Sequence, residues 1–119
     1  MKIYDSEYDT FINVDIEECI NNNNVIDGIE KTANNVIKIF PDYEFDVHIS
    51  DFGDGYFIAL ERHNSNYYLG FITNSVGELR DISQEYVNSY ESLQTMYLSI
   101  ERISMSLENL TKLIHIKWG

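Results

Sequence analysis

The spacing of apolar residues predicts a helix over residues 25–40. Apolar residues recur there every three or four positions, which is the period of an amphipathic helix. Asn24 can cap the first turn by accepting a backbone N–H, and Pro41 ends the helix because the residue before proline is driven out of the α region. The apolar positions are Val25 or Ile26, Ile29, Ala33, Val36 or Ile37, and Phe40.

Residues 42–82 have a different pattern, which predicts an antiparallel β-meander of three to four strands. Apolar and polar residues alternate from Asp42 to Ile49, so the first strand would have one apolar and one acidic face. Polar turns separate the strands, as expected for short antiparallel connections. The turns are at 51–55, 63–66 and 74–77, and the later strands are expected at 56–61, 67–73 and 78–82.

The N-terminal region allows two interpretations. Residues 10–20 fit a short helix. Residues 11–16 also fit a strand, because Ile12, Val14 and Ile16 occupy alternate positions. Residues 1–10 have no clear period, so the pattern predicts no element there.

The C-terminal region returns to a helical period and predicts a long amphipathic helix over about residues 87–112, followed by a short extended tail. Residues 103–107 and 114–118 alternate like strands, so helix and strand both remain open for residues 103–118. The apolar stripe would pack on the sheet or form the seam of a homodimer. It consists of Leu93, Met96, Ile100, Ile103, Leu107, Leu110 and Ile114.

Together these elements predict a single α+β domain over residues 1–119, with an N-terminal helix, the meander and the long C-terminal helix on the sheet. The formal charge of this domain is −12, and the excess lies in the first half. Residues 1–61 contain fourteen Asp or Glu against three Lys. Such a charge repels nucleic acid and anionic membranes and attracts basic surfaces, so the expected partner is a basic protein.

No arrangement of residues in the chain points to catalysis, a metal or a cofactor. The three histidines, His48, His63 and His115, are far apart in sequence, and no cysteine cluster accompanies them. A nucleophile elbow is also missing. We therefore expect neither an enzyme nor a cofactor-binding protein. The single Cys19 fits a reducing compartment, and no apolar run approaches the length of about 20 residues that a membrane span needs, so a cytoplasmic protein is expected.

The acidic strand and its turn are the best candidate site for a partner. Carboxylates that alternate along one strand face would form an electrostatic docking patch, and tyrosines beside it would supply the buried anchors. The alternative is a solvated sheet face that only keeps the protein in solution. The predicted partner-binding residues are Asp42, Glu44, Asp46, Asp51 and Asp54, with Tyr43, Tyr56, Tyr67 and Tyr68 as anchors.

The chain resembles the immunity proteins of bacterial toxin systems, which include contact-dependent inhibition, polymorphic toxin and colicin-like systems. Those are small, acidic, cysteine-poor domains, and the stretch His48–Ile58 is similar in character to the acidic strand-turn-strand of the ribonuclease-type colicin immunity proteins. The resemblance implies an inhibitor whose carboxylates meet the basic, nucleic-acid-binding surface of a nuclease toxin. Two alternatives remain open: a phage-encoded acidic mimic of nucleic acid that inhibits a defence nuclease, and a small dimeric scaffold or regulatory subunit.

Overall fold

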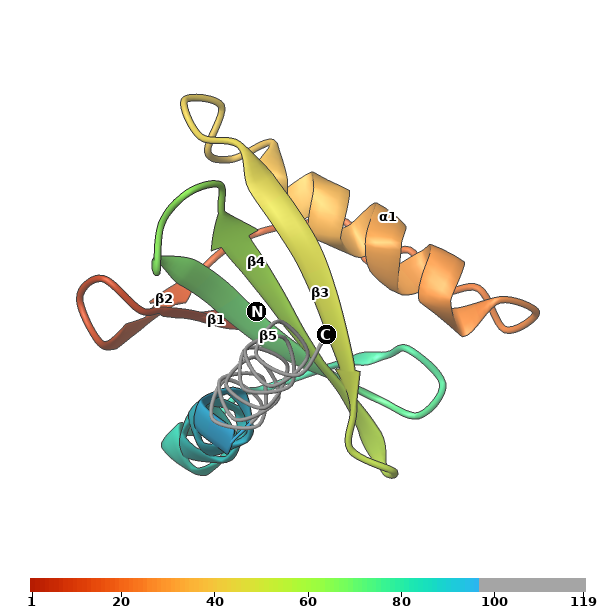
Figure 1. Ribbon diagram of the computed structural model, residues 1–119. Coiled ribbons are helices and arrows are strands. Elements are labelled where there is room, and N and C mark those ends of the chain that lie inside the picture. Colours follow the sequence, from red (N-terminus) through yellow and green to blue (C-terminus); the bar gives the residue numbers. More distant parts are fainter. Residues whose placement is uncertain (97–119) are drawn as a thin grey trace, which may run out of the picture. The chain divides into compact units, whose positions relative to one another are not determined.

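The computed structural model describes residues 1–96 (Figure 1). The chain divides into two compact units, Met1–Val87 and Asn88–Gly119. Within residues 1–96, no helix is long and apolar enough to cross a membrane.

The first unit is built on an antiparallel sheet with the order β2-β1-β5-β4-β3. A sixth strand, β6, pairs with β5 at residues 72 and 73, and β1 pairs with β5 at residues 69 and 70, so β1 and β6 share one edge of β5. The strands are β1 (Lys2–Asp5), β2 (Thr10–Asn13), β3 (Phe45–Asp51), β4 (Gly55–Arg62), β5 (Tyr68–Asn74) and β6 (Leu79–Arg80).

Helix α1 (Val25–Ile37) covers one face of this sheet. The side chain of Asn24 accepts the backbone N–H of Asp27 and caps the helix, as predicted. The helix ends three residues before the predicted end, because the last turn tightens and the N–H of Phe40 bonds to the C=O of Ile37. The core on this face consists of Ile3, Ile29, Ala33, Val36, Ile58, Leu60, Leu69 and Phe71.

The opposite face of the two central strands is buried as well. Phe57 and Ala59 of β4 are fully buried there, and Ile72 of β5 is almost so. The ring of Phe52 contacts that of Phe57, and the ring of Tyr4 contacts that of Tyr68. Burial on both faces explains why β5 is a nearly continuous apolar run in the sequence rather than an alternating one.

The α+β class and the antiparallel meander are confirmed, since β3, β4, β5 and β6 follow each other as predicted. The helical interpretation of residues 10–20 is wrong: Thr10–Asn13 form β2, which pairs with β1 in a hairpin, and residues 14–20 belong to neither a helix nor a strand. A second helix begins at residue 84 and continues to residue 96. The rest of the predicted C-terminal helix, and the open question about residues 103–118, lie outside the described residues.

Candidate partner-binding surface

The nine predicted partner-binding residues do not form one patch. The acidic strand predicted from residue 42 onward was expected to carry Asp42, Glu44 and Asp46 on one face. The corresponding strand, β3, begins only at Phe45. Asp42 instead belongs to a turn in which the N–H of Tyr43 bonds to the C=O of Phe40. Of the three carboxylates expected on the strand, only Asp46 is therefore within β3.

Asp46 is part of an acidic cross-strand group on the sheet face opposite α1. Its direct partner on β4 is Glu61, which sequence inspection did not single out. His63 Nδ1 lies 3.4 Å from Asp46 Oδ2, and His48 Nε2 lies 3.3 Å from Glu61 Oε2. Glu44 directly precedes β3 and extends this acidic group by one residue, because its C=O accepts the N–H of His63. We call Glu44, Asp46, His48, Glu61 and His63 the acidic ladder.

Tyr43 and Tyr67 lie on the other side of the sheet, in an aromatic cluster. Their ring centroids are 6.3 Å apart, and each contacts the ring of Phe45. The guanidinium carbon of Arg62 lies 4.2 Å from the centroid of Tyr43, a cation–π geometry. Tyr43 is 38% exposed, so this cluster presents an aromatic surface to solvent beside the start of β3.

The remaining predicted anchors are less accessible. Tyr68 is only 8% exposed and packs on Tyr4, so its ring belongs to the core and cannot serve as an anchor. Tyr56 is half-buried and packs against the core on the α1 side. The sequence did not distinguish these tyrosines from Tyr43 and Tyr67, because burial depends on which strand lies next to each ring.

Asp51 and Asp54 lie at the far end of β3, around the turn to β4. Asp51 is the last residue of β3, and its Oδ1 accepts the N–H of Gly53. The φ of Gly53 is 89°, a value that glycine adopts readily and other residues rarely adopt. Both carboxylates are exposed. Asp51 therefore has a structural role in the turn as well as a charge.

Carboxylates of the N-terminal hairpin approach Tyr67, which sequence inspection did not predict. Burial and, to a smaller extent, the charges of Asp5 and Glu7 together raise the pKa of the Tyr67 hydroxyl to about 12. The turn between β1 and β2 is held to the start of β5, because the N–H of Ser6 bonds to the C=O of Tyr68. Tyr8, on the same turn, is 73% exposed.

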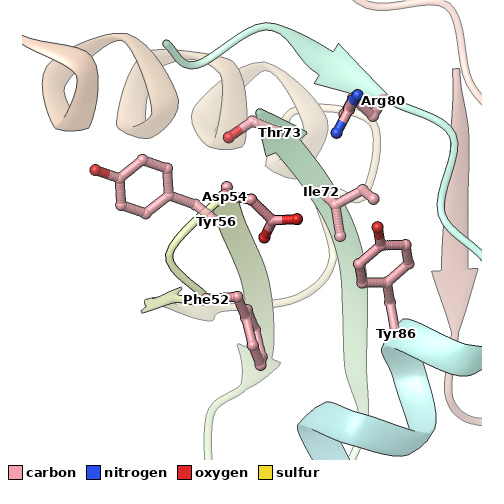
Figure 2. A pocket seen from close by; sticks show the side chains of 8 residues that line it. Phe52, Asp54, Tyr56, Ile72, Thr73, Arg80 and Tyr86 are labelled. Carbon is pink, nitrogen blue, oxygen red and sulfur yellow. The ribbon is translucent and has the colours of Figure 1, made fainter. Parts of the chain in front are cut away.

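The hollow shown in Figure 2 is too small for a substrate. It lies among the β3–β4 turn, strands β4, β5 and β6, and the start of the helix at residue 84, and its volume is about 10 Å³. That is room for about one water molecule. Sites for small molecules are usually many times larger. The side chain of Tyr56 points away from the hollow (Figure 2).

The geometry thus provides exposed charge and aromatic rings near β3. Among residues 1–96, no three His, Cys, Asp or Glu side chains come together as a metal site would require. Comparison of the chain with protein-family models, with curated proteins and with solved structures finds no match.

Proposed function

We propose that this protein is an immunity-type inhibitor, which binds a basic toxin effector domain and keeps nucleic acid from reaching it. The observation that carries the proposal is the acidic excess of residues 1–61, with fourteen carboxylates against three lysines. The partner is a nuclease domain, because such a domain must present a basic surface to its own substrate. The inhibitor would act by occlusion and would perform no chemistry.

The acidic ladder would increase the association rate, and the aromatic cluster would supply affinity. Exposed carboxylates steer a basic partner and increase the association rate, typically by roughly 10- to 1,000-fold. Affinity comes mainly from a few anchors that become buried, and tyrosine is enriched among such anchors. Tyr43 fits this role because it is 38% exposed and directly precedes Glu44, the first residue of the ladder, although its ring lies on the α1 side of the sheet. Tyr67 is half-buried, and its ring centroid lies 6.3 Å from that of Tyr43.

The first test uses the native host. An affinity-tagged wild-type protein is expected to retain a basic protein at low salt and to release it at high salt. Expression of that partner alone should arrest growth, and co-expression of the partner with the inhibitor should restore it. Failure to rescue growth, together with no salt-sensitive complex, would refute the proposed function.

Charge reversal makes the test specific to the ladder. Asp46→Lys with Glu61→Lys should reduce the association rate by roughly tenfold or more, because both substitutions act on the same face. The matched control is Glu17→Lys with Glu30→Lys, which changes the net charge equally at exposed positions on and before α1. Asp51 is a poorer choice for reversal, since its carboxylate also holds the turn at Gly53. Equal losses in both pairs would mean that only net charge matters.

A further inference from the structure

Strand β3 is an open edge of the sheet within the part of the chain that the structure describes. It pairs with β4 through all seven of its residues and with no other strand (Figure 1). At the opposite edge of the sheet, β2 has only four residues, and β6 has two. A short edge strand offers little backbone for another strand to pair with. β3 is therefore the edge with most room for an added strand.

The hydrogen-bond pattern identifies the backbone groups of β3 that point outward. At one end the C=O of Glu44 accepts the N–H of His63, and at the other the N–H of Phe52 bonds to the C=O of Gly55. The register between them is continuous, without a bulge. In an antiparallel pair, bonding alternates with every second residue, so the even-numbered residues of β3 bond to β4. Phe45, Val47, Ile49 and Asp51 consequently direct their N–H and C=O groups to the outer edge.

The apolar side chains of β3 are also incompletely covered. Phe45, Val47 and Ile49 lie on the α1 side, and all three are only half-buried. On the same side, Ile58 of β4 and Phe71 of β5 are fully buried. The difference follows from position, because β4 and β5 have a strand on each side and β3 has one on only one side. One more strand beyond β3 would cover this apolar row.

The charges on the other side of β3 limit which strand can be added. Asp46 lies in β3 opposite Glu61, Glu44 precedes the strand, and neither lysine nor proline is present in β3. Natural proteins often protect open edges with charged side chains. Here the protection is of one sign: carboxylates disfavour a second acidic strand but attract one that carries Lys or Arg.

We propose that the outer edge of β3 binds an extended segment of the basic partner as an added antiparallel or parallel strand. The inference rests on the proposed function and specifies how the partner binds. Lys or Arg at alternate positions of the segment would face the acidic ladder, and apolar residues between them would cover Val47 and Ile49. Backbone hydrogen bonds to β3 would supply affinity, and the alternating side chains would supply specificity. A second copy of this chain is disfavoured as occupant, because each copy brings a charge of −12.

A synthetic peptide tests this directly. The probe alternates Lys and Val and is about as long as β3, and the control peptide has the same composition with all Val residues before all Lys residues. The alternating peptide should bind roughly tenfold more tightly, since only it can place every charge on one face. Amide hydrogen exchange then reports the edge: the N–H groups of Val47 and Ile49 should exchange quickly in the free protein and become protected in the complex. Those of Asp46 and His48 should be protected in both.

Proline variants provide an independent readout. Val47→Pro removes an outward N–H and leaves the backbone hydrogen bonds between β3 and β4 intact. The protein should therefore fold and should bind the alternating peptide roughly tenfold more weakly. Val47→Ala removes more of the apolar side chain than proline does but keeps the N–H, so it should still bind more tightly than Val47→Pro. The exchange experiment on wild type needs no variant, so it decides the question if Val47→Pro fails to fold.

Each other outcome overturns the inference. Peptide binding without protection of Val47 and Ile49 would mean docking through side chains alone, and the proposed inhibitor function would stand. No binding of the alternating peptide, while the native partner is still retained at low salt, would have the same meaning. Protection of these amides in the free protein would show that the edge is already covered, by a second copy if protection rises with protein concentration.

Discussion

Strands β4 and β3 are neighbours in one sheet but differ in how they are covered. Four consecutive residues of β4, Phe57–Leu60, are fully buried, because the strand has neighbours on both sides and packing on both faces. β3 alternates half-buried apolar residues with exposed polar ones as far as Ile49, and Ser50 is half-buried as well. The comparison separates two tasks. The central strands hold the fold together, and the edge strand leaves backbone, charge and apolar surface available to another molecule.

The largest expected effect is a truncation in the central pair. Phe71→Ala should reduce the free energy of unfolding by roughly 3–5 kcal/mol, because the ring is fully buried against α1. Val47→Ala in β3 should cost only about 1 kcal/mol, since two methyl groups are removed from a half-buried site. Chemical denaturation of both variants measures the difference. Equal losses would show that β3 is as essential to the core as β5.

A smaller effect is expected from the close approach of β4 and β5 at Gly55. A Cβ atom at this position would collide with the backbone C=O of Thr73, which cannot move without shifting β5. Gly55→Ala should therefore destabilise the protein by roughly 1–3 kcal/mol. The control is Gly53→Asn in the turn after β3, where no atom outside the turn's adjacent residues lies within 4 Å of the position that a Cβ atom would take, and asparagine tolerates the positive φ. Its cost should be below about 1 kcal/mol in thermal or denaturant unfolding. A larger cost for Gly53→Asn would reverse the comparison.

Local patterns were sufficient for α1 and for the meander. Asn24 caps the helix as its side chain and position predict, and β4 and β5 lie close to their expected bounds. β1 was not predicted, because Ile3, Tyr4 and Asp5 are all buried and leave no alternation to detect. All four residues of β1 pair with β2 in a hairpin, but the place of β1 in the sheet depends on the pairing of Tyr4 and Asp5 with Gly70 and Leu69, more than sixty residues later. No local rule contains that information.

The candidate surface was predicted only in part, for a related reason. Alternation alone extended the acidic strand back to Asp42, but β3 starts where pairing with β4 starts, at Phe45 opposite Arg62. Glu61 was overlooked because its position beside Asp46 follows from the register of two strands. The closeness of Asp5 and Glu7 to Tyr67 likewise follows from the sheet order. The composition shows that the chain is acidic, but only the pairing of the strands determines which carboxylates lie next to one another.

The charges of the edge should contribute little to folding. Asp46→Asn removes an exposed pair with His63, and such pairs are worth at most about 1 kcal/mol, so the melting temperature should change little. The same substitution should slow association with the basic partner and should make it less sensitive to salt. Stopped-flow binding at two ionic strengths, alongside thermal unfolding, measures both. A stability loss as large as that of Phe71→Ala would mean that the edge and the centre do not differ as described.

The smallest effect concerns Tyr67, which lies where the N-terminal hairpin approaches the aromatic cluster beside β3. Its pKa of about 12 is above the usual value of 10.0, so the fold favours the protonated phenol. The corresponding stabilisation is fully present below pH 10 and is lost as the pH rises through about 12. A spectrophotometric titration should show a late tyrosine step that Tyr67→Phe removes. Glu7→Gln should move this step to lower pH, because the Glu7 carboxylate raises the pKa of Tyr67. A titration of Tyr67 near pH 10 in the folded protein would mean that its ring is exposed to water. The contacts of this ring with Tyr43 and Phe45 would then not be formed as described.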